Sequence, residues 1–190
     1  MPIFYRGAGV GTYWHKNDAR ATGFVAHSPL VPASADRLVN HIARGTTFSP
    51  YVSLTASYAV GSSYASSGTT LPTRRHPGYV YEIQIDEAIP AGLTLIEPIR
   101  DIANAFWSPT CRTRFHHDGT PKFLLGVLDP AGHASHLTAP CVLPPAGNTI
   151  TKAPVLFPEL QALVWALRDS EVLVLGGIPR ANVITRYDVY

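Results

Sequence analysis

Three short segments, far apart in the chain, carry residues whose types could do chemistry together. The segment FYRG places Arg6 at the end of an expected strand, where its guanidinium could bind a phosphate or carboxylate through two parallel hydrogen bonds. The segment YVSLT places Ser53 and Thr55 on one face of a strand, because successive side chains of a strand point to opposite faces. The segment EVLVLGGIP places Glu171 at the head of another strand. These residues offer an anion-binding cation, two hydroxyls and a carboxylate.

Each segment alone also has an ordinary structural explanation. An arginine at a strand end commonly forms a surface ion pair. Strand hydroxyls are commonly satisfied by the backbone, and an acid that opens a strand is commonly solvated. A functional interpretation therefore depends on the three segments occurring together and in this order.

Together, Arg6, the Ser53-x-Thr55 pair and Glu171 resemble the Arg-Ser-Glu, or cholera-toxin-like, class of ADP-ribosyltransferases. The order and spacing agree over residues 4 to 186, and GGIP follows the strand that the acid opens. The strand YVYEIQI looks like the middle strand of the pierisin- and scabin-like branch of these bacterial toxins. The resemblance implies an α+β fold of two packed, mostly antiparallel sheets with an NAD cleft and flanking helices, formed by one catalytic domain over residues 1–190.

The resemblance assigns roles around NAD, which would be a substrate. Cleavage of its glycosidic bond develops positive charge on the ribose, and the Glu171 carboxylate would stabilise that charge. Ser53 would order the acid and the ribose, with Thr55 supporting the site. Arg6, with Gly7 beside it, would hold the diphosphate.

Two tyrosines in the segment after SLT, Tyr58 and Tyr64, are candidates to stack on nicotinamide, with ordinary core packing as the equal alternative. Asp169 stands where the family has Gln or Glu and is the residue expected to position the acceptor. Leu54 replaces the central Thr of the family motif. Because Asp is shorter than Glu but keeps its charge, the acceptor is left open as a protein or a nucleic acid.

We expect transfer of ADP-ribose from NAD to that macromolecule, by a toxin or effector that releases nicotinamide. A toxic NAD glycohydrolase on the same fold is the alternative within enzymes, and a catalytically inactive binding module is the alternative outside them. The intact Arg6, Ser53 and Glu171 argue against the inactive module.

Composition favours a globular protein. Of the 190 residues 46% are hydrophobic and 15% are charged, and the formal net charge of +2 permits nucleic acid as a partner without arguing for it. No apolar stretch approaches the roughly 20 residues of a membrane span, so we expect no membrane partner. We also expect a monomer. The first residues, MPIFYRG, lack the pattern of an export signal. We therefore expect a cytoplasmic protein, or one delivered into a target cell without a cleavable signal.

We expect no metal. In RFHHDG (114–119) adjacent side chains of an extended segment point apart, and no distant cluster completes a site. Cys111 and Cys141 are expected to be free thiols. Arg74, Arg75 and His76 could contact an anionic acceptor, although a solvated loop is the simpler explanation.

The hydrophobic pattern indicates several strands and few helices, without regular alternation of the two. Loops are expected over 11–33, 66–78 and 131–154. Helices are expected over 34–45, 56–65, 99–107 and 158–171. Strands are expected over 2–9, 51–55, 79–86, 122–130, 171–177 and 181–190, and a strand or an extended turn over 92–98.

Overall fold

The computed structural model describes residues 2–85, 93–105 and 158–190. Several predictions from the sequence lie outside these residues. They are the strand 122–130, the loop 131–154, the RFHHDG segment (114–119), and the free thiols of Cys111 and Cys141.

The described strands form a six-stranded sheet and a two-stranded sheet, and their pairings are antiparallel. The six-stranded order is β5-β6-β3-β1-β4-β8, and β2 pairs with β7 in the smaller sheet. The prediction of a mixed α+β chain with mostly antiparallel strands is therefore confirmed. The strands are β1 (Ile3–Ala8), β2 (Phe24–Val25), β3 (Tyr51–Thr55), β4 (Gly78–Gln84), β5 (Thr94–Ile96), β6 (Glu171–Leu175), β7 (Gly177–Ile178) and β8 (Val183–Val189).

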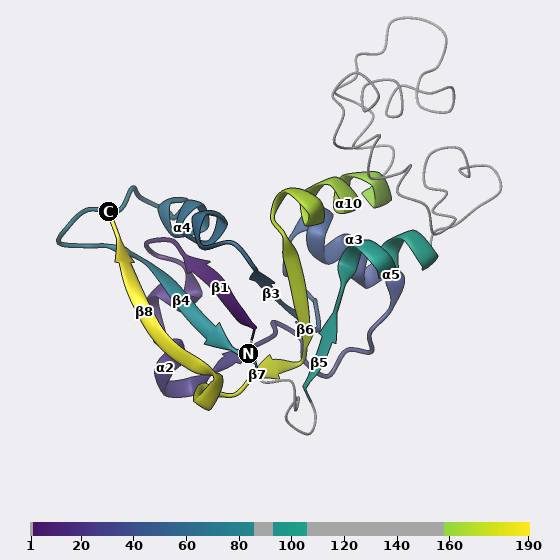
Figure 1. The fold of residues 1–190 in the computed structure, drawn as a ribbon, viewed down its shortest axis with the longest axis horizontal. Helices are drawn as coiled ribbons and strands as arrows, with labels where there is room; N and C mark the ends of the chain where they lie inside the picture. The colour runs from purple at the N-terminus through teal and green to yellow at the C-terminus, as the bar shows by residue number, and fades with distance from the viewer. Residues whose placement is uncertain (1, 86–92, 106–157) are drawn as a thin grey trace, which may run out of the picture. The chain divides into compact units, whose positions relative to one another are not determined.

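The chain divides into two compact units. The first unit holds both sheets, and Figure 1 shows α4 along one side of β1 and β4 with α2 near β8. The second unit spans residues 34–45 and 98–167, where α3 packs against α5. The single catalytic domain stays a prediction. The helices are α1 (Tyr13–Lys16), α2 (Ala19–Thr22), α3 (Ala35–Arg44), α4 (Tyr58–Ser66), α5 (Pro98–Ala105) and α10 (Pro158–Arg168), with a 3-10 turn at Arg180–Asn182.

Most expected helices and strands within the described residues are confirmed, with shifts at their ends that have local causes. The expected strand 171–177 is instead divided at Gly176, with its positive φ of 79°, into β6 and the first residue of β7 in the smaller sheet. Helix α3 begins after Ser34, whose side chain accepts a hydrogen bond from the Arg37 backbone N–H, and ends before Gly45 with its positive φ of 101°. Helix α4 begins two residues later than expected, because Ser57 caps it and the preceding Ala56 donates its backbone N–H to the Ser170 carbonyl.

The prediction of a loop over 11–33 is wrong in part, because α1, α2 and β2 lie within it. Helix α2 has a local signal in Asp18, whose side chain accepts a hydrogen bond from the Arg20 backbone N–H. Strand β2 has no local signal, because it exists through its pairing with β7, more than 150 residues away in the chain. Gly23 joins α2 to β2 with a positive φ of 75°.

The six-stranded sheet has two faces of different character. One face carries Phe4, Val52, Leu54 and Val174, which pack into one buried cluster with Phe24 of β2. The other face carries the hydroxyls of β3 and lies against α4 through β1 and β4. The alternation that was expected from YVSLT, with apolar residues inward and hydroxyls on the second face, is confirmed.

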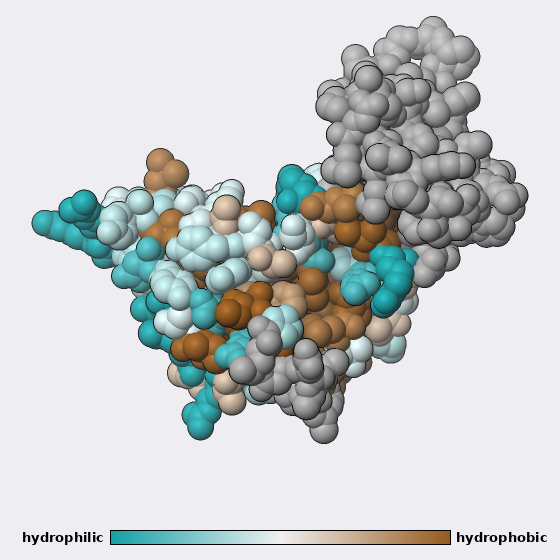
Figure 2. All heavy atoms as spheres, viewed as in Figure 1, coloured by the Kyte–Doolittle hydropathy of each residue, from teal (hydrophilic) through white to brown (hydrophobic). Residues whose placement is uncertain are grey.

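The predicted basic loop residues Arg74, Arg75 and His76 are exposed. They lie between α4 and β4, where Figure 2 shows hydrophilic residues at the end of the loop. Arg74 lies over the ring of Tyr190, 5.6 Å from its centroid. None of the helices in the described residues combines the length and apolar character that crossing a bilayer requires.

Gly7 permits the close approach of α4 to β1. A Cβ at this position would lie 2.2 Å from the Gly61 carbonyl oxygen and 2.6 Å from Tyr64 Cβ. The role of Gly7 in this contact is therefore a packing role, independent of any ligand.

We predict that Gly7→Ala lowers the free energy of unfolding by about 1–3 kcal/mol, because the added methyl overpacks rigid backbone. Chemical denaturation would measure the change. Gly61→Ala is the matched control: its Cβ would meet Tyr5 Cβ at 3.2 Å, and alanine favours the helix interior by up to about 1 kcal/mol. Equal losses in the two variants would show that the α4–β1 contact does not depend on Gly7.

Candidate functional site

Strand β3 lies between β6 and β1, and this order brings together the three residues that carry the sequence resemblance. Thr55 lies directly opposite Glu171 of β6 on one side and opposite Tyr5 of β1 on the other. A hydrogen bond joins the side chains of Ser53 and Glu171. Arg6 Nη1 donates to the Ser53 carbonyl at 2.5 Å. A single chain of contacts thus connects Arg6, Ser53 and Glu171 across three neighbouring strands.

The Glu171 carboxyl sits in an environment that disfavours its charge. Its pKa is raised from 4.5 to about 7, chiefly by burial and in smaller part by the nearby Asp169 carboxylate. The Ser53 hydrogen bond and the Arg6 and Arg168 guanidinium groups act in the opposite direction, but they do not cancel the burial. A buried carboxyl with a pKa near 7 has few water molecules around its ionised form. Such a group is suited to stabilising a positive charge that develops beside it.

Arg6 projects from the opposite face of the sheet to Ser53 and Glu171, because it lies one residue along β1 from Tyr5. Its guanidinium lies over the Phe24 ring, 5.6 Å from the centroid, and Phe24 also contacts Trp14 edge-to-face. Burial lowers the Arg6 pKa to about 10, although the Glu171 charge raises it. Arg6 Nε is buried and donates no hydrogen bond. The side chain is therefore a charged group with an unused donor.

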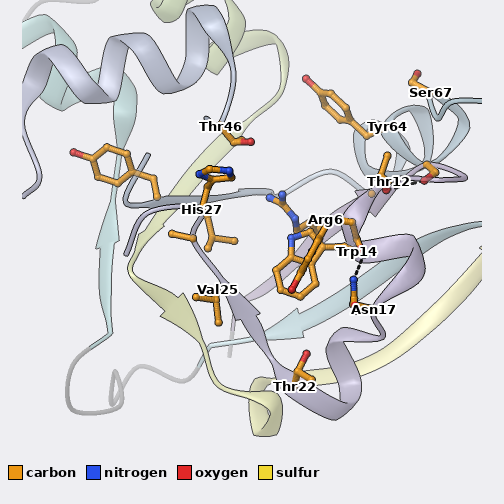
Figure 3. Close-up of a pocket in the computed structure, with 16 residues that line it drawn as sticks. Arg6, Thr12, Trp14, Asn17, Thr22, Val25, His27, Thr46, Tyr64 and Ser67 are labelled. Atoms are coloured by element: carbon orange, nitrogen blue, oxygen red, sulfur yellow. Dashed lines mark hydrogen bonds between the residues drawn. The ribbon is translucent and has the colours of Figure 1, made fainter. Parts of the chain in front are cut away.

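A pocket of about 590 Å³ opens around Arg6. Figure 3 shows its guanidinium directed into the space bordered by His27, Thr46 and Tyr64. Ser53 and Glu171 are not among the residues that line this pocket, whereas Arg6, which bonds to the Ser53 carbonyl, is. The lining also includes Gly7, Gly9, Thr12, Tyr13, Trp14, Asn17, Thr22, Val25, Ala26, Tyr51, Val52 and Ser67.

The turn before β6 is fixed to the end of β3. The Thr55 hydroxyl donates to the Asp169 carbonyl at 2.5 Å and accepts from the Ser57 backbone N–H at 3.0 Å, and Ala56 N–H donates to the Ser170 carbonyl. Ser170 has a positive φ of 45°, a conformation that non-glycine residues rarely adopt. Thr55 is buried and positions this turn, and hence the start of the strand that Glu171 opens.

Asp169, the expected acceptor-positioning residue, has both carboxylate oxygens engaged. Arg168 donates from Nε to Oδ1 at 2.6 Å and from Nη2 to Oδ2 at 2.7 Å, and the Tyr64 hydroxyl donates to Oδ2 at 2.5 Å. Burial alone would raise the Asp169 pKa, but these bonds hold it below its ordinary value. Burial and the bond to Asp169 raise the Tyr64 pKa to about 12. Arg168 was missed in the sequence, where an arginine that ends a helix has no distinguishing mark.

The two predicted stacking tyrosines lie in different places. Tyr64 lines the pocket and binds Asp169. Tyr58 does not line it and instead contacts Tyr5 and Tyr187 edge-to-face. Trp14 and His27 line the pocket although no sequence pattern indicated them, because they come from the segment that was expected to be a featureless loop.

The described residues contain no group of three or more His, Cys, Asp or Glu side chains that could hold a metal ion. The chain matches no family model, and no curated protein matches it.

We predict that Glu171→Gln makes the fold more stable at high pH. The folded-state pKa is raised, so the folded protein binds the extra proton between about pH 4.5 and 7, and the stability of the natural chain falls as pH rises through this range. Glutamine removes that loss, which amounts to at most about 3 kcal/mol above pH 7 and almost nothing near pH 4.

Denaturant unfolding at pH 4 and pH 8 would measure the effect of Glu171→Gln. The control is Asp188→Asn, which removes one carboxylate from an exposed position on β8. A Glu171→Gln variant that gained no stability at pH 8 relative to pH 4 would contradict the burial of this carboxyl.

Proposed function

We propose that this chain is an enzyme of the ADP-ribosyltransferase fold that cleaves NAD and transfers ADP-ribose to a macromolecular acceptor. The observation that carries the proposal is the chain of contacts from Arg6 through Ser53 to Glu171, beside a pocket of about 590 Å³. That volume falls within the usual range of small-molecule sites. The antiparallel pairing of the strands in two sheets is compatible with the proposed fold.

In the proposed reaction the bond between ribose C1′ and the nicotinamide nitrogen breaks, and its electron pair leaves with nicotinamide. The ribose carries positive charge in the transition state, as in glycoside hydrolysis. The acceptor's nucleophile forms the new bond to C1′ and loses its proton. The ionised Glu171 carboxylate stabilises the ribose cation, and the Ser53 hydrogen bond favours that ionised form.

Arg6 suits the anionic part of NAD. Its buried Nε has no partner, and an unmet buried donor costs about 1–3 kcal/mol, which a phosphate oxygen would relieve. The Phe24 ring beside the guanidinium, with Trp14 against it, lowers the local dielectric constant and so strengthens the attraction between the guanidinium and a diphosphate. Tyr64 and Trp14 offer ring surfaces in the same pocket for a nicotinamide or adenine.

One observation favours NAD glycohydrolase as the second candidate. Both oxygens of Asp169 are held by Arg168 and Tyr64, so this carboxylate is not free to hold an acceptor. In that case water would take the place of the acceptor, and the products would be free ADP-ribose, nicotinamide and a proton.

Incubation with NAD labelled in its adenosine part, together with a whole-cell lysate, tests the proposal. The label would be sorted into protein, nucleic acid and free ADP-ribose. Label on a macromolecule supports transfer, whereas label only in free ADP-ribose supports the glycohydrolase. Unchanged NAD after prolonged incubation would contradict both.

We predict that Glu171→Gln lowers NAD turnover by about 10²–10³-fold, because one preorganised electrostatic group is lost from the transition state. NAD affinity should change little, since the ground state feels this charge less. Release of nicotinamide and titration calorimetry would measure the two quantities. Turnover close to that of the natural chain would show that Glu171 is not a catalytic residue, and the proposal would be wrong.

We predict that Arg6→Lys weakens NAD binding by roughly tenfold while the sheet stays folded. Lysine keeps the charge but cannot donate simultaneously to the Ser53 carbonyl and to a phosphate in the planar arrangement of a guanidinium. Calorimetric titration with NAD measures the affinity, and far-ultraviolet circular dichroism checks the fold. NAD affinity equal to that of the natural chain would show that Arg6 is not part of the NAD-binding site.

A further inference from the structure

A row of directly opposed residues crosses the sheet from the candidate catalytic acid. Glu171 lies opposite Thr55, Thr55 opposite Tyr5, and Tyr5 opposite Glu82 of β4. Opposed residues of neighbouring strands present their side chains on the same face. Because neighbouring strands are about 4.8 Å apart, Glu82 lies roughly 14 Å from Glu171 along this row. The row has a carboxylate at each end.

Tyrosine rings gather at the Glu82 end of the row. The Tyr58 ring of α4 meets Tyr5 at 5.4 Å and Tyr187 at 5.8 Å, with interplanar angles of 88° and 80°. The Tyr187 hydroxyl donates to Glu82 Oε2 at 2.8 Å. Tyr58 and Tyr187 remain 43% and 40% exposed. We call these four residues the tyrosine cluster.

The two faces of the sheet differ in charge, because the face opposite the row carries Asp188 and two arginines. Among the strands that the structure describes, the arginines of this sheet, Arg6 and Arg186, both lie opposite Tyr81 and so project from the other face. The face with the row carries Glu82 and Glu171, and the α4 segment YAVGSSYAS that packs on it has no charged residue. Aromatic faces next to the Glu82 carboxylate attract a cation, whereas that carboxylate would repel a phosphate.

We propose that the tyrosine cluster docks an arginine or lysine side chain of a protein acceptor. This inference rests on the proposed function and makes its acceptor a protein with a basic residue near the modified one. The middle of the row is covered by α4, whose Gly61 lies against Tyr5, so the acceptor would reach the tyrosine cluster at its exposed end. The proposal also gives Tyr58 a role at the acceptor, away from the pocket around Arg6.

Binding of a short peptide to the full chain without NAD tests the docking site. The probe is a heptapeptide of glycine and serine with a single central arginine, and the matched peptide carries neutral citrulline in its place. Nuclear magnetic resonance titration, followed through tyrosine ring signals, gives the affinities. We expect the arginine peptide to bind more tightly than the citrulline peptide, with shifts in the tyrosine cluster.

Two variants and one control locate the binding. Tyr58→Leu and Glu82→Gln should each weaken the arginine peptide roughly two- to fivefold, as expected for one exposed cation–π contact or charge. Asp188→Asn is the matched control, because it removes the same charge from the same strand pair on the opposite face and should leave the affinity unchanged. Equal effects of Glu82→Gln and Asp188→Asn would overturn the docking site and indicate only long-range charge.

Two further outcomes separate this inference from the proposed function. A single-stranded oligonucleotide that binds in place of the arginine peptide, with loss in Tyr58→Leu, would overturn the choice of a protein acceptor. If NAD is cleaved but neither peptide binds, the docking proposal is wrong and the proposed function stands. If the arginine peptide binds at the tyrosine cluster but NAD is never cleaved, the proposed function is wrong and the cluster stands as a peptide-binding surface.

Discussion

The pairing of β3 with β6 on one side and β1 on the other is the constraint on which the rest of the site depends. It places the Glu171 carboxyl beside Ser53, and it lets the Arg6 guanidinium reach the Ser53 carbonyl from the neighbouring strand. The bonds from Thr55 and Ala56 to the turn before β6 fix the position of that strand along β3. A slip by one residue would move Glu171 to the opposite face of the sheet.

The same arrangement lowers the stability of the fold at the groups that the proposed reaction uses. A carboxyl with a pKa of about 7 and a buried, unpartnered guanidinium nitrogen both disfavour the folded state near neutral pH. The surrounding core compensates, since Val52, Leu54 and Val174 pack with Phe24 directly behind the site. Groups held in this unsatisfied state are preorganised for a ligand that supplies the missing partners, which is the property the proposed function requires.

Local patterns predicted the elements whose signals are local. The alternation in YVYEIQ indicated β4, and Ser34 and Gly45 indicated the two ends of α3. The meeting of Arg6, Ser53 and Glu171 could be anticipated through the family resemblance, but spacing alone could not place three distant segments on adjacent strands. Tertiary contacts decide the rest: β2 forms through β7, and the Asp169 carboxylate is occupied by neighbours that no motif marks.

The proposed function requires Glu171 to be a desolvated carboxylate placed to meet the positive charge of NAD. Its titration can be followed by carbon-13 resonance of the carboxyl group, assigned by comparison with Glu171→Gln. We predict a pKa near 7 for Glu171 in the free protein. We also predict a lower pKa in the presence of an NAD analogue whose ribose ring oxygen is replaced by carbon, because the positive nicotinamide favours the ionised form. A pKa near 4.5 that the analogue does not change would contradict both predictions.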